Sequence, residues 1–272
     1  MRANKLRELL KSNKPTLSTH IHTTWPSVVE AIGHTGLYDY VEFVGEYGPF
    51  DLHDLDNLAR AADIYNMSMQ LKVDQEPRGF LAQRAIGSGF HSILFADCRS
   101  AADVHECVRI VRAETPEDGG TYGVATRRFT YMGYGGGKQY VQALRDIVVA
   151  IMIEKPGTVD TLEECLSVKG VDMVQFGPAD YAMSIGLAGQ WGHPKVKEAE
   201  RFVIETALRK GIAPGKSLLG VRSLRMCSSW TRIIPGKRRR MLNSRSIRLH
   251  FWRAGCSSGF TRAGMRPGPG RR

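Results

Sequence analysis

The chain has 272 residues, which is long enough for one α/β barrel domain or for two small domains. No uncharged apolar run approaches the roughly 20 residues of a membrane-spanning helix, and the five cysteines form no CxxC pair, so the sequence indicates neither a membrane protein nor a disulfide or zinc framework. The formal net charge of +11 would suit a nucleic-acid partner, but it comes from only one part of the chain.

The N-terminal residues carry basic side chains and three leucines at helical spacing, Leu6, Leu9 and Leu10. Their apolar part is too short for the core of a signal peptide. We therefore expect a cytoplasmic protein.

From residue 16 to about residue 215, short apolar strands alternate with amphipathic helices. Expected strands span residues 16–22, 38–44, 68–73, 92–96, 147–154 and 171–176, and a seventh begins within 211–216. Expected helices span residues 25–36, 52–66, 76–89, 101–113, 158–168 and 193–211. Repeated strand–helix units predict a parallel sheet, and we expect an α/β barrel domain over residues 1–215.

The remaining segment, residues 216–272, has a different composition. It contains 15 Lys or Arg and no Asp or Glu, which leaves a net charge of −4 on the residues before it. One interpretation is a tail that binds RNA or DNA through "KRRR", with Trp230, Phe251 and Trp252 as stacking residues. The other is a frameshift product, because shifted GC-rich coding DNA tends to yield Arg, Ser, Cys, Gly and Trp. We favour the frameshift and expect no nucleic-acid partner, because no binding fold organises these charges.

Two carboxylates follow successive expected strands. Glu154 ends the strand "IVVAIMIE", and Asp180 comes after "VDMVQF" and a Gly-Pro-Ala turn. The C-terminal strand ends of a β/α barrel build its active site, so both acids would face one pocket. Two carboxylates with water and a chelating substrate suit Mg²⁺ or Mn²⁺. Taken alone, each acid is better explained as a cap of the following helix.

The residues around both acids resemble the HpcH/HpaI aldolase/citrate lyase family of metal-dependent pyruvate aldolases. In that family one strand ends in "IE" and the next in "GPADL", matched here by residues 153–154 and 177–180. The stretches "GHPKV" and "YDYVEFVGEYGPFDL" resemble further family segments, so the resemblance covers about residues 17–214. It implies an eight-stranded (β/α)8 TIM barrel of the phosphoenolpyruvate/pyruvate type. It also implies an activity similar to that of aldolases for 4-hydroxy-2-oxoheptanedioate or 2-keto-3-deoxy acids.

The resemblance further implies an aldehyde-lyase that cleaves a 4-hydroxy-2-oxo acid to pyruvate and an aldehyde. Glu154 and Asp180 would hold a divalent metal, Mg²⁺ or Mn²⁺ with Co²⁺ as a third candidate, which would chelate pyruvate and stabilise its enolate as a Lewis acid. Backbone groups of Gly177, Pro178 and Ala179 would position the substrate. The trimers and hexamers of the family imply a homo-oligomer here if the C-terminus is intact.

The chain departs from the family pattern at the proton carrier. Many members have Asp-Gly-Glu-His where residues 44–47 read Val-Gly-Glu-Tyr, so Tyr47 replaces the histidine associated with proton transfer. A tyrosine, with a pKa near 10, is a poor base at pH 7. Period 2 places His20 and His22 on one face of the first strand. If this face is the barrel interior, either histidine could supply the missing imidazole; the alternative is that both are packed or hydrogen-bonded histidines without a catalytic role. The candidate catalytic residues are His20, His22, Glu46 and Tyr47.

A second departure concerns the substrate carboxylate. The carboxylate-binding arginine of the family aligns with Leu71, and Lys72 lies one position later. Lys72 could hold a carboxylate as a point charge, without the bidentate fork of arginine. Alternatively it could form a Schiff base with pyruvate in a metal-free aldolase. We rank this second, because the paired acids would then have no role.

Overall fold

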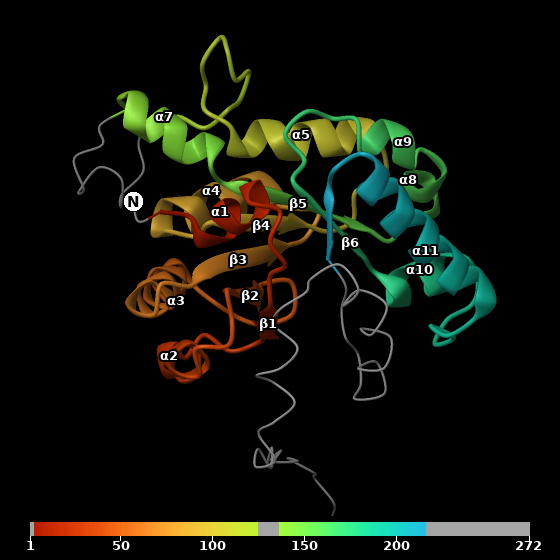
Figure 1. Ribbon diagram of the computed structural model, residues 1–272, viewed down its shortest axis with the longest axis horizontal. Coiled ribbons are helices and arrows are strands. Elements are labelled where there is room, and N and C mark those ends of the chain that lie inside the picture. Colours follow the sequence, from red (N-terminus) through yellow and green to blue (C-terminus); the bar gives the residue numbers. More distant parts are fainter. Residues whose placement is uncertain (1–2, 125–135, 216–272) are drawn as a thin grey trace, which may run out of the picture. The chain divides into compact units, whose positions relative to one another are not determined.

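The computed structural model describes residues 3–124 and 136–215 (Figure 1). These residues belong to the first of two compact units, Met1–Ser217, and the second unit, Leu218–Arg272, lies outside the described residues. The basic segment 216–272 and both of its interpretations therefore remain predictions. Within the described ranges no helix is long and apolar enough to cross a membrane.

Seven parallel strands form one sheet in chain order. They are β1 (Ser18–Ile21), β2 (Tyr40–Val44), β3 (Ser68–Val73), β4 (Ser92–Phe95), β5 (Val148–Ile153), β6 (Met173–Phe176) and β7 (Ala213–Gly215). All seven strands expected from the sequence are present. Parallel neighbours in strict chain order are the arrangement of a β/α barrel.

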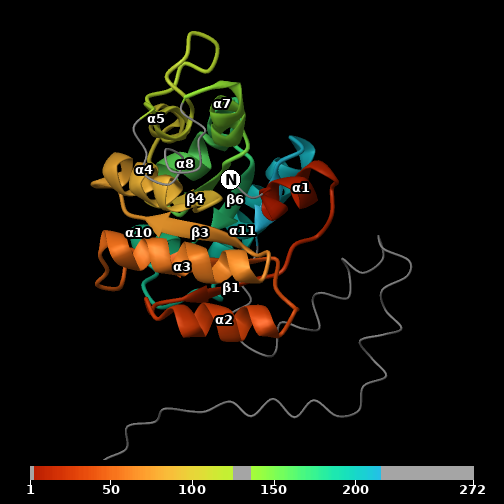
Figure 2. The same cartoon turned by 90° about the vertical axis from the view of Figure 1, so that its left-hand side faces the viewer.

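Apart from α1 (Lys5–Lys11), which precedes the first strand, the helices connect the strands and lie around the outside of the curled sheet (Figures 1 and 2). They are α2 (Pro26–His34), α3 (Leu52–Ile64), α4 (Arg78–Ser88), α5 (Ala101–Val111), α7 (Lys138–Arg145), α8 (Pro156–Asp160), α9 (Leu162–Cys165), α10 (Pro178–Ser184) and α11 (Pro194–Arg209). The expected helix over 158–168 is two short helices, α8 and α9. Neither α7 nor the seven-residue α10 was expected, because glycine-rich or proline-rich turns precede both.

The described part of the sheet is a half-barrel with two edges. Among the described residues β1 pairs only with β2, and β7 pairs only with β6. Closure of a (β/α)8 barrel needs one more strand between these edges. The α/β class and the parallel sheet are thus confirmed, and the closed eight-stranded barrel stays a prediction.

Side chains alternate between the two faces of the sheet, as period 2 requires. The outward set packs under the helices in the main core, and it includes Val41, Phe43, Met69, Leu71, Ile93 and Phe95. The inward set forms a smaller core together with Leu6 of α1, and its members are Tyr40, Leu94, Val148, Ala150, Met152 and Met173. Leu71, which aligns with the arginine of the family, is fully buried under the helices. It therefore cannot bind a substrate on the inner face.

The inner face also carries a row of hydrogen-bonded polar side chains. The Gln70 Nε2 donates to Oε2 of Glu42 at 2.8 Å, and the Ser92 hydroxyl donates to Oε1 of Gln70 at 2.8 Å. His20 is in register with Glu42 on the neighbouring strand. Burial raises the pKa of the Glu42 carboxyl, although the Gln70 hydrogen bond and the charge of Lys72 oppose this.

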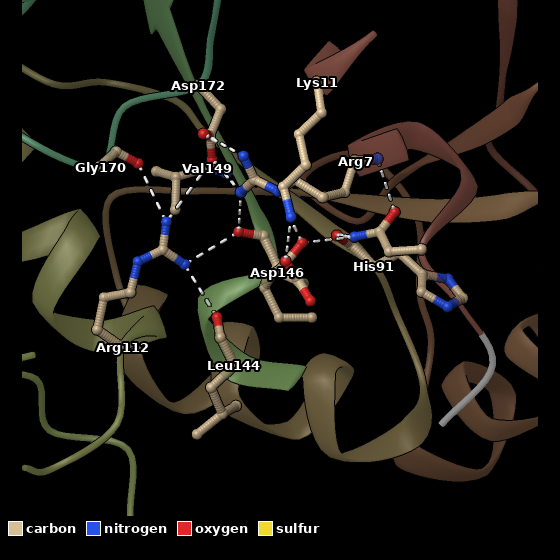
Figure 3. Close-up of polar contacts among 11 residues, drawn as sticks. Arg7, Lys11, His91, Arg112, Leu144, Asp146, Val149, Gly170 and Asp172 are labelled. Carbon is tan, nitrogen blue, oxygen red and sulfur yellow. Dashed lines mark hydrogen bonds and ion pairs between the residues drawn. The ribbon is translucent and has the colours of Figure 1, made fainter. Parts of the chain in front are cut away.

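Helix α1 covers the N-terminal ends of the strands (Figure 3). The Asn4 Nδ2 donates to the carbonyls of His91 and Asp146, each at 2.8 Å. The Arg7 guanidinium donates to both carboxylate oxygens of Asp172 at 2.5 and 2.6 Å, and Arg112 lies 3.6 Å from the same carboxylate. These contacts tie α1 to the starts of β4, β5 and β6. The active site of a β/α barrel lies at the opposite, C-terminal ends of the strands, so we regard this network as structural.

Candidate active site

The two predicted metal ligands lie at the C-terminal ends of neighbouring strands. Glu154 directly follows β5, and Asp180 lies in the first turn of α10, after β6. Strands β5 and β6 pair in parallel, with Ile153 opposite Phe176. The register thus brings both carboxylates to one end of the sheet, as the sequence predicted.

Glu154 is a buried carboxylate with few partners. It is 2% exposed, and its Oε1 accepts a 2.8 Å hydrogen bond from the Asp97 N–H. Burial raises the pKa of the Glu154 carboxyl to about 7, and the negative charges of Asp180 and Asp97 add to this against the Asp97 N–H and Lys72. A cation at this position would relieve the cost of burying the charged form.

Asp180 is half-exposed, and Lys155 lies near both Asp180 and Asp97, which belongs to the loop after β4. The Lys155 Nζ lies 2.5 Å from Oδ1 of Asp97 and 3.9 Å from Oδ1 of Asp180. Burial lowers the pKa of Lys155, but the hydrogen bond and charge of Asp97 outweigh it and the net shift is upward. Lys155 is therefore a cation that pairs with Asp97 of this loop and lies at ion-pair distance from Asp180 of α10.

Gly177 leaves room beside the second oxygen of Glu154. A Cβ at position 177 would stand 2.6 Å from Oε2 and 2.8 Å from Cβ of Glu154. Only glycine therefore permits this approach. The donor set of buried Glu154 and half-exposed Asp180 fits a hard divalent cation, which prefers carboxylate oxygens.

Lys72 contacts two of the candidate catalytic residues. Its Nζ forms an ion pair with Glu46 and donates a 3.3 Å hydrogen bond to the Tyr47 hydroxyl. Burial lowers the pKa of Lys72, but Glu46 and Tyr47 outweigh it, so the net shift is upward. Lys72 is thus held as a charged ammonium on the inner face, whereas Leu71 lies on the outer face.

Tyr47 and the two histidines gather beside Lys72. The ring centroids of His22 and Tyr47 are 5.7 Å apart, and those of His20 and His22 are 5.4 Å apart. Burial raises the pKa of the Tyr47 hydroxyl, with Lys72 opposing, so Tyr47 is a neutral phenol near pH 7. Both histidines are exposed.

Electrostatic coupling joins this group to the paired acids. The charge of Asp180 raises the pKa of Tyr47, and that of Lys72 lowers the pKa of Glu154. Ion pairs, hydrogen bonds or charge interactions therefore link five of the predicted residues, Glu46, Tyr47, Lys72, Glu154 and Asp180. The two exposed histidines join this group through ring contacts. Gly177 contributes differently from the prediction, because its N–H donates to the Ile153 carbonyl at 3.0 Å. Pro178 has no N–H, which leaves those of Ala179 and Asp180 as donors.

A further acidic group was not found from the sequence. Carboxylate oxygens of Glu46, Asp74 and Asp97 lie within 4.8 Å of one another and could hold a metal ion. Lys72 already pairs with Glu46 and Lys155 with Asp97, so two cations neutralise much of this charge. Asp74 and Asp97 follow the ends of β3 and β4, and the strand-end rule that found Glu154 could have found them.

A model of the HpcH/HpaI aldolase/citrate lyase family matches residues 19–228 of the chain. The chain belongs to this family. It is 28% identical over 225 residues to a hydroxypyruvate/pyruvate aldolase of Paraburkholderia phytofirmans, covering 81% of this chain and 85% of the relative. It is 24% identical over 216 residues to a 2-keto-3-deoxy-L-rhamnonate aldolase of Escherichia coli K12, covering 79% and 78%.

The fold of a solved family member agrees with this assignment. The crystal structure of an HpcH/HpaI aldolase from Desulfitobacterium hafniense superposes with a TM-score of 0.74 at 25% identity, covering 84% of this chain and 87% of that one. The resemblance inferred from the sequence is confirmed, and with it an aldolase of the lyase class. Neither the Schiff-base enzyme nor the nucleic-acid-binding protein is supported by these relatives.

Proposed function

We propose that this chain cleaves a 4-hydroxy-2-oxo acid into pyruvate and an aldehyde, using a divalent metal held by Glu154 and Asp180. The observation that carries the proposal is the buried Glu154 carboxylate. Its Oε2 faces the space that Gly177 leaves, and Asp180 lies close enough to raise its pKa. A bound Mg²⁺ or Mn²⁺ would act as a Lewis acid toward the keto oxygen of the substrate.

The remaining residues bind and orient the substrate. The Lys72 ammonium, held by Glu46 and Tyr47, supplies a fixed positive charge for the substrate carboxylate. The N–H groups of Ala179 and Asp180 are further donors in the first turn of α10. The Tyr47 hydroxyl accepts from Lys72 and orients it, rather than acting as the base.

The proton of the C4 hydroxyl needs a base, and His22 is the side chain best suited to this role. Imidazole exchanges protons near neutral pH, which a phenol and a paired ammonium do not. His22 contacts the Tyr47 ring and thus lies beside the residue that replaces the histidine of the family. Abstraction of the C4 hydroxyl proton then drives cleavage of the C3–C4 bond and releases the aldehyde.

A Schiff-base mechanism through Lys72 is disfavoured by its surroundings. A lysine nucleophile must be neutral, which usually needs a lowered pKa. Glu46 and Tyr47 instead give Lys72 a net upward shift.

The test is pyruvate release from a 4-hydroxy-2-oxo acid by the purified full chain. We expect activity that EDTA abolishes and that Mg²⁺ or Mn²⁺ restores. Activity that survives complete metal removal, or trapping of pyruvate on Lys72 by borohydride, would overturn the metal mechanism. A homo-oligomer and a cytoplasmic location remain further proposals, to be checked by sedimentation and by cell fractionation.

A further inference from the structure

Two buried cysteines and a buried arginine lie together outside the residues assigned to the lyase reaction. Cys98 follows β4 and Cys107 lies in α5, and their Sγ atoms are 3.7 Å apart. Arg78, the first residue of α4, directs Nη1 toward Sγ of Cys107 at 3.2 Å and toward Sγ of Cys98 at 3.9 Å. Both cysteines are 0% exposed and Arg78 is 7% exposed.

Arg78 forms no ion pair with a carboxylate in the described ranges, although its pKa, which burial alone would lower, is raised in part by the charge of Asp103. Its Nε donates to the Gln75 carbonyl at 2.8 Å. A buried guanidinium needs an anion nearby to offset its desolvation. The nearest group that can become an anion is the Cys107 thiol, and a neighbouring arginine favours the thiolate, which is the reactive form of cysteine.

A cavity lies beside the arginine of this group. A cavity of about 490 Å³ is lined in part by Arg78, Gly79 and Asp103. Asp103 lies one turn before Cys107 on α5. A small polar molecule in this cavity therefore meets the guanidinium that also contacts both sulfur atoms.

We propose that Cys98 and Cys107 form a redox pair that hydrogen peroxide oxidises to an intramolecular disulfide, with Arg78 activating Cys107. The Cys107 thiolate attacks one peroxide oxygen, the O–O bond breaks, and the departing hydroxide takes up the former thiol proton to become water. Cys107 is then a sulfenic acid. The Cys98 sulfur attacks it, the S–O bond breaks, and the second hydroxide leaves as water with the Cys98 proton. Two thiols thus lose two electrons and one hydrogen peroxide becomes two waters.

The pair is joined to the candidate metal site through one peptide unit. Cys98 directly follows Asp97, whose N–H holds Oε1 of Glu154 and whose backbone has a φ of 55° in the left-handed region. Disulfide formation must bring the sulfurs from 3.7 Å to about 2.05 Å. We expect disulfide formation to weaken the hydrogen bond from the Asp97 N–H to Glu154. Of the expectations in this proposal, only the effect on the metal site rests on the proposed function.

The test maps disulfides in the full chain without using lyase activity. The reduced protein is treated with hydrogen peroxide, free thiols are alkylated, and the digest is analysed by mass spectrometry. We expect a peptide pair linked through Cys98 and Cys107, formed about ten-fold faster than any oxidation of buried Cys165. Cys98→Ser should stop the reaction at a Cys107 sulfenic acid that dimedone traps, and Cys165→Ser, the matched control, should leave the linkage unchanged.

Arg78→Met tests whether the positive charge activates Cys107. Arg78→Lys keeps a positive charge and should retain part of the rate of Cys107 oxidation. We expect Arg78→Met to slow oxidation of Cys107 about ten-fold in protein that keeps the wild-type circular dichroism spectrum. If Arg78→Met does not fold, the linkage in the unmodified chain still decides the proposal. Wild-type protein that stays folded in peroxide without the linked peptide, or Cys107→Ser protein that labels with dimedone at Cys98 as fast as the wild type reacts, would overturn it. Loss of lyase activity without the linkage would speak against the proposed pair and leave the metal mechanism standing.

Discussion

The backbone N–H of Asp97 donates a 2.8 Å hydrogen bond to Oε1 of Glu154, across the ends of neighbouring strands β4 and β5. The donor is a backbone N–H, so the bond that orients Glu154 does not depend on the side chain at position 97. The bond uses only one of the two carboxylate oxygens. The second oxygen is left facing Gly177. This division of the carboxylate, one oxygen fixed and one available, is what a metal ligand needs from the residues around it.

Removing either paired carboxylate should therefore abolish metal binding. Glu154→Gln keeps the shape and the bond from Asp97, yet it removes the charge, and Asp180→Asn does the same at the second position. We expect Mn²⁺ affinity, measured by electron paramagnetic resonance, to fall at least about 100-fold in each. Glu198→Gln, on the exposed face of α11, serves as the control. Mn²⁺ binding that survives both substitutions would move the metal to the Glu46, Asp74 and Asp97 group.

Gly177 offers a steric test of the same oxygen. In Gly177→Ala the new Cβ would stand 2.6 Å from Oε2 of Glu154, closer than such contacts ever come, so the carboxylate must move. We expect kcat/KM for aldol cleavage to fall at least about ten-fold, with a stability cost of about 1–3 kcal/mol. Gly192→Ala is the matched control, because nothing lies within 4 Å of its Cβ. Equal effects of the two substitutions would contradict an oxygen that needs this space.

Substitutions can distinguish His22, the proposed base, from Tyr47, which stands where many family members have a histidine. Tyr47→Phe removes the hydroxyl that accepts from Lys72 but no base, so we expect a loss of kcat below about ten-fold. His22→Asn should lower kcat for aldol cleavage about 100-fold or more, because it removes the proposed base. His20→Asn, on the stacked neighbour, is the control. A larger loss in Tyr47→Phe than in His22→Asn would assign the proton to Tyr47 instead.

The network under the barrel predicts a stability effect that leaves the active site alone. Asp172→Ala leaves Arg7 and Arg112 near each other without their shared carboxylate, so we expect the free energy of unfolding to fall by about 3 kcal/mol. Lys11→Ala breaks an exposed pair with Asp146 and should cost less than about 1 kcal/mol. Urea unfolding measures both. Equal costs would show that partial burial adds nothing to the Asp172 network.

Much of the fold was predictable because period 2 and period 3.6 are local signals. Strands β2 to β6 read directly as largely apolar runs, and Glu154 and Asp180 follow from the rule that strand ends build the site. The same alternation explains the Lys72 position, since it places Leu71 under the helices and Lys72 on the inner face. Alignment by position alone points to Leu71, which lies in the main core.

Contacts between distant residues were not predictable, because they depend on loop geometry and on closure of the sheet. The Asp97 bond to Glu154 needs a left-handed residue after β4, for which an aspartate gives no periodic signal. The Arg7 pair with Asp172 joins residues 165 positions apart. Pairing of Lys72 with Glu46 likewise follows from the register of β2 and β3, which no single strand specifies.

Glu42 predicts a pH dependence of stability on the inner face of the sheet. Burial raises the pKa of this carboxyl in the folded chain above the value of about 4.3 that glutamate has when unfolded. Between the two values the folded state binds more protons than the unfolded state, so the free energy of unfolding falls as pH rises. Glu42→Gln cannot ionise and still offers an oxygen to Gln70, so it lacks this loss. The groups that face Glu42, namely Lys72, Glu46 and His22, are the same in both proteins.

We therefore expect Glu42→Gln to gain stability relative to the wild type as pH rises from about 4 through neutral, and to show little difference below it. Urea unfolding of both proteins at several pH values measures the difference, and Glu205→Gln, an exposed position on α11, controls for the loss of one surface charge. A difference between the two proteins that stays constant with pH, or that shrinks as pH rises, would mean that Glu42 is charged in the folded chain. Lys72 and His22 would then neutralise it more strongly than burial penalises it, and the inner face would be an ion-pair network continuous with the site.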